Sequence, residues 1–425
     1  MRVLCAADIH LGRRPSRLPE PLAGRAGELD PAAAWRRLVR VALDRGVDAL
    51  LLAGDVVDQD NDFFEAYADL REGVEQLTEA GIPVLAVAGN HDVQVLPRLA
   101  EAVPGFTLLG RGGRWQEHVL EGSEGTRVRV LGWSFPDRVA PDDPLASPLP
   151  ERGAETTIGL LHCDRGQPGS RYAPVRTAEL EAAPVDVWLL GHVHKPDIEP
   201  GPRPMGYLGS LVGTDPGEPG AHGAWLLEVG PRGEPQLRAV PLAPLRWETL
   251  DVPLDGLADA ADVPVRIAKA IDALHRRLDE EAPGALAIGC RLELTGRTAL
   301  RGAVARTLAA DDPRAAAYPR DGTTYFVHAY ALQALPERDL EALARSADPV
   351  GLLARKLRLL RGHGDPAART ALLRAATQHL AEVPERRPLR AAGGAPPSEE
   401  RVAELLEAAA LDALDALLEQ KEGAA

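Results

Sequence analysis

The chain has 425 residues, a formal net charge of −15 at pH 7 and three cysteines. This length exceeds what a single hydrophobic core usually supports, so we expect one large domain and one or two smaller ones. The acidic balance argues against a general nucleic-acid binder, although it does not exclude an enzyme that acts on DNA. Cys5, Cys163 and Cys290 are too few and too scattered for a disulfide framework or a cysteine metal site, which favours a reducing compartment. The chain shows no secretion signal and no apolar run long enough to cross a bilayer, so the sequence predicts a cytoplasmic protein.

Three apolar runs in the first hundred residues each end at polar residues. They are residues 2–7, followed by Asp8-Ile9-His10, residues 48–53, followed by Gly54-Asp55, and residues 82–88, followed by Gly89-Asn90-His91-Asp92. Such runs are typical of buried parallel strands, and open α/β folds bind ligands at the edge where these strands end. Residues 31–45 and 62–80 have apolar residues at helical spacing, whereas residues 11–30 contain too many glycines and prolines for a regular element. The order of strands and helices predicts a parallel layer covered by helices.

Two later apolar runs repeat this pattern. Residues 157–161 lead to His162, and residues 185–190 lead to Gly191-His192-Val193-His194. Five predicted strand ends therefore deliver an oxygen and nitrogen ligand set that consists of Asp8, His10, Asp55, Asn90, His162, His192 and His194. This set suits divalent metals such as manganese, iron or zinc.

Shorter, alternating strands follow from residue 106 onwards. We expect them at residues 115–120, 128–135, 205–208, 224–229 and 237–242, with loops at 136–155 and 196–222. These strands and the N-terminal layer predict an α/β (α+β sandwich) fold, in which a two-sheet core is flanked by helices. The first domain is expected to cover residues 1–244.

The remaining chain is expected to form a small accessory domain and a helical region. Residues 245–336 are predicted to be α+β, with helices at 265–278 and 300–308 and strands at 286–294 and 325–331. Residues 337–383 are expected to be helical, 384–397 a linker, and 398–425 an amphipathic helix with Ser398 as its N-cap. The apolar stripe of this last helix either packs back on its own helical region or docks on a partner helix.

The predicted metal ligands suit a two-metal hydrolase. Asp8 and His10 are two residues apart, so on a strand they would face the same way and grip one ion together. Asp55 can bridge two ions about 3.5–4 Å apart, and such a pair acidifies a bridging water, which is the expected nucleophile. His91 is placed to protonate the leaving group, with Asp92 orienting its imidazole.

These motifs resemble those of the calcineurin-like metallophosphoesterases, and within them the SbcD-type DNA repair exonuclease subunits. The motifs are D-x-H at 8–10, G-D at 54–55, G-N-H-D at 89–92, H at 162 and G-H-x-H at 191–194, with Gly206–Ser210 matching a glycine-serine turn of the family. The resemblance implies a metal-dependent exonuclease or endonuclease that acts on DNA ends, with two divalent ions, most often manganese. It places Asp8, His10, Asp55 and one of His192 and His194 on the first ion, and Asp55, Asn90, His162 and the other histidine on the second. The alternation of the two histidines suggests His194 for the first ion.

One position departs from the resemblance. Asp58 stands where some relatives have a second active-site histidine. Asp58, Arg13 and Arg14 are candidate substrate-binding residues. The resemblance also implies an SbcC-type coiled-coil ATPase partner, docked by the last helix or by the helix at 352–360, and a homodimer. Two alternatives stay open, namely a phosphoesterase for a non-DNA ester such as a cyclic nucleotide or phosphoprotein, and a non-catalytic regulatory subunit of such an ATPase.

Overall fold

The computed structural model describes residues 1–59, 62–122, 125–230, 232–281, 284–382 and 398–423. It contains an α/β core of two mixed sheets, an additional small sheet and a group of C-terminal helices, which confirms the predicted fold class. The chain divides into two compact units. The first contains Met1–Leu250, Ile271–Arg291 and Arg314–Ala329, and the second contains Asp251–Ala270, Leu292–Pro313 and Tyr330–Ala425.

The first sheet of the first unit has six strands in the order β11-β10-β1-β2-β3-β4. They are β1 (Arg2–Ala6), β2 (Ala49–Ala53), β3 (Val84–Val87), β4 (Phe106–Leu108), β10 (Gly223–Val229) and β11 (Pro235–Pro241). Strands β1 to β4 are parallel, which the sequence predicts for β1 to β3. Strand β10 pairs antiparallel with β1, and β11 pairs antiparallel with β10. The parallel strands are buried because helices cover one face and the second sheet covers the other.

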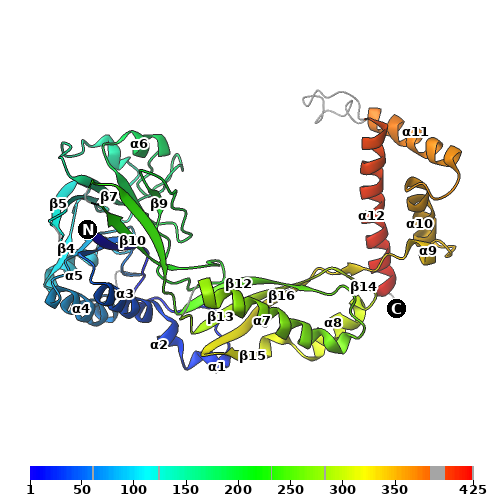
Figure 1. Cartoon of the computed structure of the whole chain (residues 1–425), viewed down its shortest axis with the longest axis horizontal. Coiled ribbons are helices and arrows are strands. Elements are labelled where there is room, and N and C mark those ends of the chain that lie inside the picture. Colours follow the sequence, from blue (N-terminus) through cyan, green and yellow to red (C-terminus); the bar gives the residue numbers. More distant parts are fainter. Residues whose placement is uncertain (60–61, 123–124, 231, 282–283, 383–397, 424–425) are drawn as a thin grey trace. The chain divides into compact units, whose positions relative to one another are not determined.

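Helix α3 (Pro31–Arg45) on this sheet begins and ends at the expected signals. It begins after Asp30, whose side chain accepts a hydrogen bond from the backbone N–H of Ala33, and ends at Gly46 in the left-handed conformation. Helix α4 (Phe63–Glu79) lies beside it (Figure 1), and α5 (Leu96–Ala102) follows β3. The stretch expected to be irregular contains two short helices, α1 (Glu20–Ala23) and α2 (Ala26–Leu29). They form because Leu22 and Leu29 are buried in the core, which outweighs the glycines and prolines around them.

The second sheet has the order β5-β6-β7-β8-β9. Its strands are β5 (Gln116–Glu121), β6 (Arg127–Trp133), β7 (Thr156–His162), β8 (Val187–Gly191) and β9 (Met205–Tyr207), with α6 (Thr177–Ala182) before β8. Only the β5–β6 pair is antiparallel among these strands. Side chains from the two sheets interdigitate in one core; Val3 and Leu51 of the first sheet pack with Val130 and Leu160 of the second. This arrangement is the predicted sandwich.

A third sheet has the order β12-β13-β16-β15. Its strands are β12 (Leu245–Pro253), β13 (Ala287–Thr295), β15 (Ala317–Arg320) and β16 (Thr323–Leu332), and the chain between them forms α7 (Val263–Glu281) and α8 (Arg301–Ala310). The sequence predicted α7, α8, β13 and β16, whereas β12 and β15 were not foreseen. Two-residue strands β14 (Arg297–Thr298) and β17 (Leu335–Pro336) pair with each other.

In the described part of the second unit after β17, the chain forms α9 (Leu340–Leu343), α10 (Pro349–Leu360), α11 (Pro366–Glu382) and α12 (Glu399–Gly423). Ser398 caps α12, because its hydroxyl accepts a hydrogen bond from the backbone N–H of Arg401 at 3.3 Å. In α12, Leu414 and Leu418 pack against α10, while Leu405 is 42% exposed. The apolar stripe therefore packs in large part on its own helical region.

The predicted linker at 384–397 lies outside the described residues. No helix within the described ranges is both long and apolar enough to span a membrane.

Candidate metal centre

The ends of β1, β2, β3, β7 and β8 bring all seven predicted ligands to one region of the first unit. Asp8, His10 and Asp55 have left-handed backbone conformations, with φ of 49°, 53° and 47°, and His192 has a φ of 105°. Strand β1 ends at Ala6, so Asp8 and His10 do not share a strand face, contrary to the expectation from their spacing. Turns in sparsely populated backbone conformations, not strand alternation, aim these side chains together, as is common at functional sites.

The side chains form two clusters. Asp8, His10 and His194 offer ligand atoms within 4.8 Å of one another, and Asp55, His162 and His192 do the same. His194 therefore belongs to the first cluster and His192 to the second, as the alternation of these two histidines in the sequence suggested.

Asp55 connects the two clusters, and Asn90 joins the second one. Oδ2 of Asp55 lies 3.3 Å from Nε2 of His162 in its own cluster and 3.9 Å from Nε2 of His10 in the other. Oδ1 of Asn90 lies 3.2 Å from Nε2 of His162 and 3.1 Å from Nδ1 of His192. Asp55 is therefore the side chain that reaches towards both groups.

The centre concentrates charge in a buried place. Asp8 and Asp55 are 1% and 2% exposed and His162 is fully buried. Burial raises the pKa of Asp8. Burial also acts to raise the pKa of Asp55, but the neighbouring His162 outweighs it, so that the pKa of Asp55 is lowered. Burial disfavours the charged form of His162, but the carboxylates of Asp55 and Asp8 raise its pKa to about 9. Burial and the nearby His162 lower the pKa of His192 to about 4.

This donor set fits divalent cations. Nε2 of His10 lies 3.1 Å from Nε2 of His194, and Nδ1 of His192 lies 3.3 Å from Nε2 of His162. At most one proton can sit between two such ring nitrogens, whereas a cation satisfies both lone pairs and the adjacent carboxylates together. The clusters are consistent with a dimetal phosphoesterase site.

In each of the four histidines, an oxygen atom lies close to the other ring nitrogen. The pairs are His10 with Asp58 at 3.0 Å, His192 with Asp164 at 3.2 Å, His194 with Glu218 at 3.1 Å, and His162 with the carbonyl of Ala53 at 3.0 Å. Such contacts fix the orientation and tautomer of a ligating histidine and increase its basicity. Asp164 and Glu218 were not foreseen from the sequence. Asp164, two residues after His162, could have been suspected; Glu218 lies in a proline-rich and glycine-rich loop and carries no signal of its own.

His91 and Asp92 lie beside the centre in different environments. His91 is exposed, its ring is 5.1 Å from that of His10, and its Nδ1 lies 2.8 Å from the carbonyl oxygen of Asp58. Asp92 is fully buried and accepts hydrogen bonds from the backbone N–H groups of Gly89 at 2.8 Å and Val56 at 2.7 Å. The expected role of Asp92 therefore needs correction: its carboxylate ties the loops after β2 and β3 together, and the carbonyl of Asp58 contacts the His91 ring.

The three candidate substrate-binding residues have different surroundings. Burial acts to raise the pKa of Asp58, but the contact with His10 lowers it on balance, and the charge of Arg13 also lowers it. Arg13 is half-buried and Arg14 is exposed. A cavity of about 300 Å³ opens on this side and is lined by Asp58, Gln59, Asn90, His91, Arg138, Val139 and Tyr172. Asp58 is thus part of the centre and of the adjoining cavity.

Gly54 shows why glycine stands in the G-D motif. It has a φ of +90°, and a Cβ at this position would lie 2.6 Å from Nδ1 of His162. A larger residue would therefore displace a histidine of the centre.

Comparison with known proteins identifies two regions of similarity. Residues 1–196 match the family model for calcineurin-like phosphoesterases, and residues 247–333 match that for the middle domain of the metallophosphoesterase YhaO. The chain is 29% identical to an uncharacterized metallophosphoesterase YhaO of Bacillus subtilis, over 53% of this chain and 56% of that protein.

Two further relatives carry the names of DNA-processing proteins. The DNA double-strand break repair protein Mre11 of Aeropyrum pernix is 40% identical over 49% of this chain and 53% of its own length. The SbcD protein of the SbcCD nuclease of Rhodobacter capsulatus is 26% identical over 62% of this chain and 74% of its length. The matched part of this chain spans about half the length of YhaO and of the Mre11 protein.

Proposed function

We propose, on the premise that residues 1–196 form a calcineurin-like metallophosphoesterase domain, that the protein hydrolyses phosphodiester bonds at DNA ends. The observation that carries the hydrolytic part is the position of Asp55 between two ligand clusters, beside the exposed His91. The DNA part is supported by similarity to proteins named for double-strand break repair and for the SbcCD nuclease.

In this proposal the two clusters hold two divalent ions. Asp8, His10 and His194 would bind the first, His162, His192 and Asn90 the second, and Asp55 would contact both. Bound ions would supply the positive charge that activates water and neutralises the phosphoryl oxygens, with manganese the expected metal. Asp58, Asp164 and Glu218 would hold the histidine rings so that their metal-facing nitrogens keep a lone pair.

His91 is the proposed general acid. The carbonyl of Asp58 accepts from its Nδ1, which leaves Nε2 as the nitrogen that can give a proton to the leaving oxygen. Its exposure suits this role because a substrate must reach the ring. Asp92 acts indirectly, by fixing the loop that carries Asn90 and His91.

A direct assay tests the proposal. Purified protein is incubated with end-labelled linear duplex DNA in Mn²⁺, in Mn²⁺ with excess chelator, and as an Asp55→Asn variant. We expect degradation only by the unchanged protein with free Mn²⁺. Parallel reactions with a cyclic nucleotide and a phosphopeptide test the non-DNA alternatives. Hydrolysis of one of these without DNA cleavage would contradict the DNA assignment, and no hydrolysis of any ester would favour a non-catalytic subunit.

We also propose an SbcC-type coiled-coil ATPase as partner, by similarity to the SbcD protein of the SbcCD nuclease. Leu352 of α10 and Leu405 of α12 are 52% and 42% exposed on two helices that pack together, and they are the positions that we assign to helix docking. Substituting both with Asp should abolish co-purification with the ATPase and leave hydrolysis by the isolated protein intact. Unchanged co-purification would contradict this assignment.

A further inference from the structure

A buried histidine, His222, lies behind the metal centre in the first unit. It directly precedes β10, and it is only 5% exposed. Its main-chain carbonyl accepts hydrogen bonds from the backbone N–H groups of Leu242 at 3.3 Å and Ala243 at 3.4 Å, two residues that follow β11. The paired strands β10 and β11 therefore fix the backbone of His222, and its ring has a rigid base.

The ring of His222 belongs to a chain of polar contacts that leads to the metal centre. Its Nδ1 lies 2.9 Å from the hydroxyl oxygen of Ser210 and 3.1 Å from the carbonyl oxygen of the same residue. Its Nε2 lies 3.1 Å from the carbonyl oxygen of Glu218. The Ser210 hydroxyl lies 2.9 Å from Oε2 of Glu218, and that oxygen lies 3.1 Å from Nδ1 of His194. Three contacts thus connect His222 with a proposed ligand of the first ion.

Ser210, the middle member of this chain, is held by the ligand-bearing segments themselves. Its backbone N–H donates to the carbonyl of His194 at 2.9 Å, and its backbone forms an isolated parallel bridge with Ala7, the residue before Asp8. Ser210 is 2% exposed. Because its backbone is fixed and water does not reach it, the groups around its side chain decide where its hydroxyl proton points.

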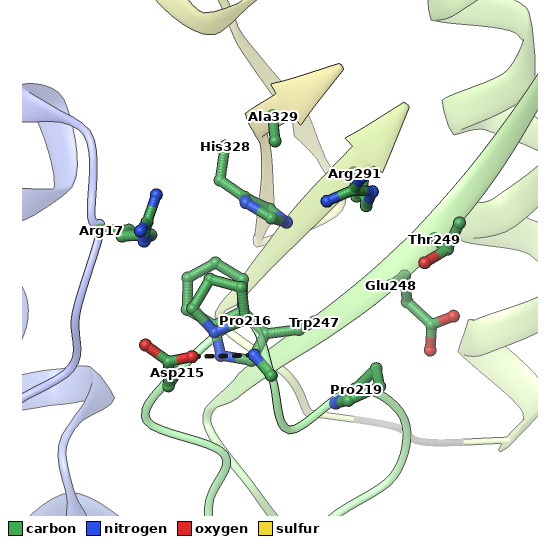
Figure 2. Close-up of a pocket in the computed structure, with 11 residues that line it drawn as sticks. Arg17, Asp215, Pro216, Pro219, Trp247, Glu248, Thr249, Arg291, His328 and Ala329 are labelled. Carbon is green, nitrogen blue, oxygen red and sulfur yellow. Dashed lines mark hydrogen bonds between the residues drawn. The ribbon is translucent and has the colours of Figure 1, made fainter. Parts of the chain in front are cut away.

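The loop that carries Glu218 is held by contacts that do not involve the ring of His222. The indole N–H of Trp247 donates to the carbonyl of Gly213 at 2.9 Å, and the carbonyl of Trp247 accepts from the N–H of Gly220 at 2.9 Å. Figure 2 shows this loop, which contains Pro216, beside Trp247. We therefore expect the main chain of the loop to stay in place when the ring of His222 is replaced, so that the change falls on the direction of the Glu218 carboxylate.

A count of protons shows which nitrogen of His222 is the donor. Burial lowers the pKa of His222, so its ring is neutral at pH 7 and carries one proton. With this proton on Nδ1, the ring donates to the Ser210 oxygens and the Ser210 hydroxyl donates to Glu218, which leaves only the contact of Nε2 without a proton. With the proton on Nε2, the contact of Nδ1 with the Ser210 carbonyl lacks a proton, and the single hydroxyl proton serves either Nδ1 or Glu218. The Nδ1–H form leaves fewer contacts unsatisfied and keeps the bond to the charged acceptor, which is the stronger kind.

We propose that His222 is a positioning residue for the first metal ion. Its Nδ1–H holds the Ser210 oxygens, the Ser210 hydroxyl then points to Glu218, and the carboxylate keeps the ring of His194 in the orientation that binds the ion. The inference rests on the proposed function, since that assigns a metal ion to His194. It deepens the proposal because His222 is a member of neither ligand cluster and lies three contacts behind one of them.

Metal titration of the full chain tests the inference without a substrate. Calorimetric titration of the metal-free protein with Mn²⁺ compares the unchanged protein with three variants. In His222→Asn an amide nitrogen takes the place of Nδ1, in His222→Gln it takes the place of Nε2, and His222→Phe keeps a ring of similar size without either nitrogen. His275→Phe is the matched control, because both ring nitrogens of this α7 histidine also contact oxygen atoms, those of Tyr325 at 3.1 Å and Asp321 at 3.2 Å.

We expect His222→Phe and His222→Gln to weaken the binding of one of two Mn²⁺ ions about tenfold, because the orientation of a metal-binding histidine is lost. His222→Asn should recover most of the affinity, and His275→Phe should bind Mn²⁺ as the unchanged protein does. Unaltered affinities of His222→Phe and His222→Gln would overturn the inference, and so would a loss in His222→Asn as large as in His222→Phe.

A double-mutant cycle separates positioning from a general disturbance of the fold. Adding His222→Phe to Glu218→Ala should weaken Mn²⁺ binding no further, because the carboxylate through which His222 acts is already gone. A further loss equal to that of His222→Phe alone would overturn the inference. Absence of Mn²⁺ binding by the unchanged protein would overturn the metal-centre proposal and this inference with it, whereas normal binding with unaltered His222 variants would overturn this inference alone.

Discussion

Oε2 of Glu218 lies 3.1 Å from Nδ1 of His194 and accepts a hydrogen bond from the hydroxyl of Ser210 at 2.9 Å. The carboxylate is therefore held from behind while it faces the histidine. Because Nδ1 of His194 is engaged in this way, Nε2 is the nitrogen that points to His10 and to the proposed first ion.

Loss of Glu218 should weaken metal binding. We expect Glu218→Ala to lower the apparent Mn²⁺ affinity about 10- to 100-fold, because the histidine loses its orienting partner. Calorimetric titration of the metal-free protein with Mn²⁺ gives the affinity directly. Glu218→Gln, which keeps an acceptor oxygen, should recover part of the loss, and Glu228→Gln on β10 should bind Mn²⁺ as the unchanged protein does. An unaltered affinity of Glu218→Ala would show that the contact has no bearing on the metal.

His91 should matter most when the leaving group is poor. If its Nε2 protonates the departing oxygen, His91→Asn should slow cleavage of DNA about 10²- to 10⁴-fold. The same variant should slow hydrolysis of bis(p-nitrophenyl) phosphate far less, because p-nitrophenolate leaves without protonation. Rates for both esters are compared at saturating Mn²⁺, and Mn²⁺ affinity is measured to show that the centre is intact. Equal losses on the two esters would assign His91 to charge stabilisation instead of proton transfer.

The sequence was sufficient to predict which residues meet at the centre, because each follows an apolar run, and these runs form the parallel strands of the two packed sheets. It was not sufficient to predict how Asp8 and His10 converge, since left-handed backbone turns leave no periodic signal. The contact of Glu218 with His194 also escaped prediction. It depends on a loop that tertiary hydrogen bonds to Trp247 hold in place, and such long-range contacts cannot be read from local pattern.

Alanine substitutions at Gly54 and Gly46 distinguish a side-chain clash from backbone strain. Gly54→Ala places a Cβ against the ring of His162, so we expect loss of Mn²⁺ binding and of hydrolysis. Gly46→Ala at the end of α3 is the matched control: its φ is also positive, at 53°, but its Cβ would meet open space. That control should cost about 1–2 kcal/mol of stability and keep its metal affinity. Calorimetric Mn²⁺ titration and thermal unfolding measure the two effects. Retained Mn²⁺ binding in Gly54→Ala would contradict the predicted clash.

Asp415 of α12 anchors this helix in the second unit through two arginines. Its Oδ1 lies 3.0 Å from Nη1 of Arg297 and 2.8 Å from Nε of Arg338, and Oδ2 lies 2.9 Å from Nη2 of Arg297. Burial acts to raise the pKa of Asp415, but the hydrogen bonds from Arg338 and Arg297 lower it to about 2. The contacts of Asp415 with the two arginines contribute more to the stability of the fold than an exposed ion pair would, because the Asp415 side chain is only 8% exposed.

The lowered pKa of Asp415 predicts a pH-dependent stability of the second unit. An aspartate with a folded-state pKa near 2 and an unfolded-state pKa near 3.9 contributes about 2.6 kcal/mol at pH 7, and most of this contribution is lost as the pH falls from about 4 towards 2. We therefore expect Asp415→Asn to lower the free energy of unfolding by this amount at pH 7, with a gap to the unchanged protein that narrows below pH 4. Urea unfolding followed by circular dichroism at 222 nm measures the gap. All six tryptophans lie in the first unit, so tryptophan fluorescence should show an unchanged transition. Asp412→Asn, at an exposed position on the same helix, should have no effect, and a gap that stays constant between pH 7 and pH 2.5 would contradict the role of the carboxylate.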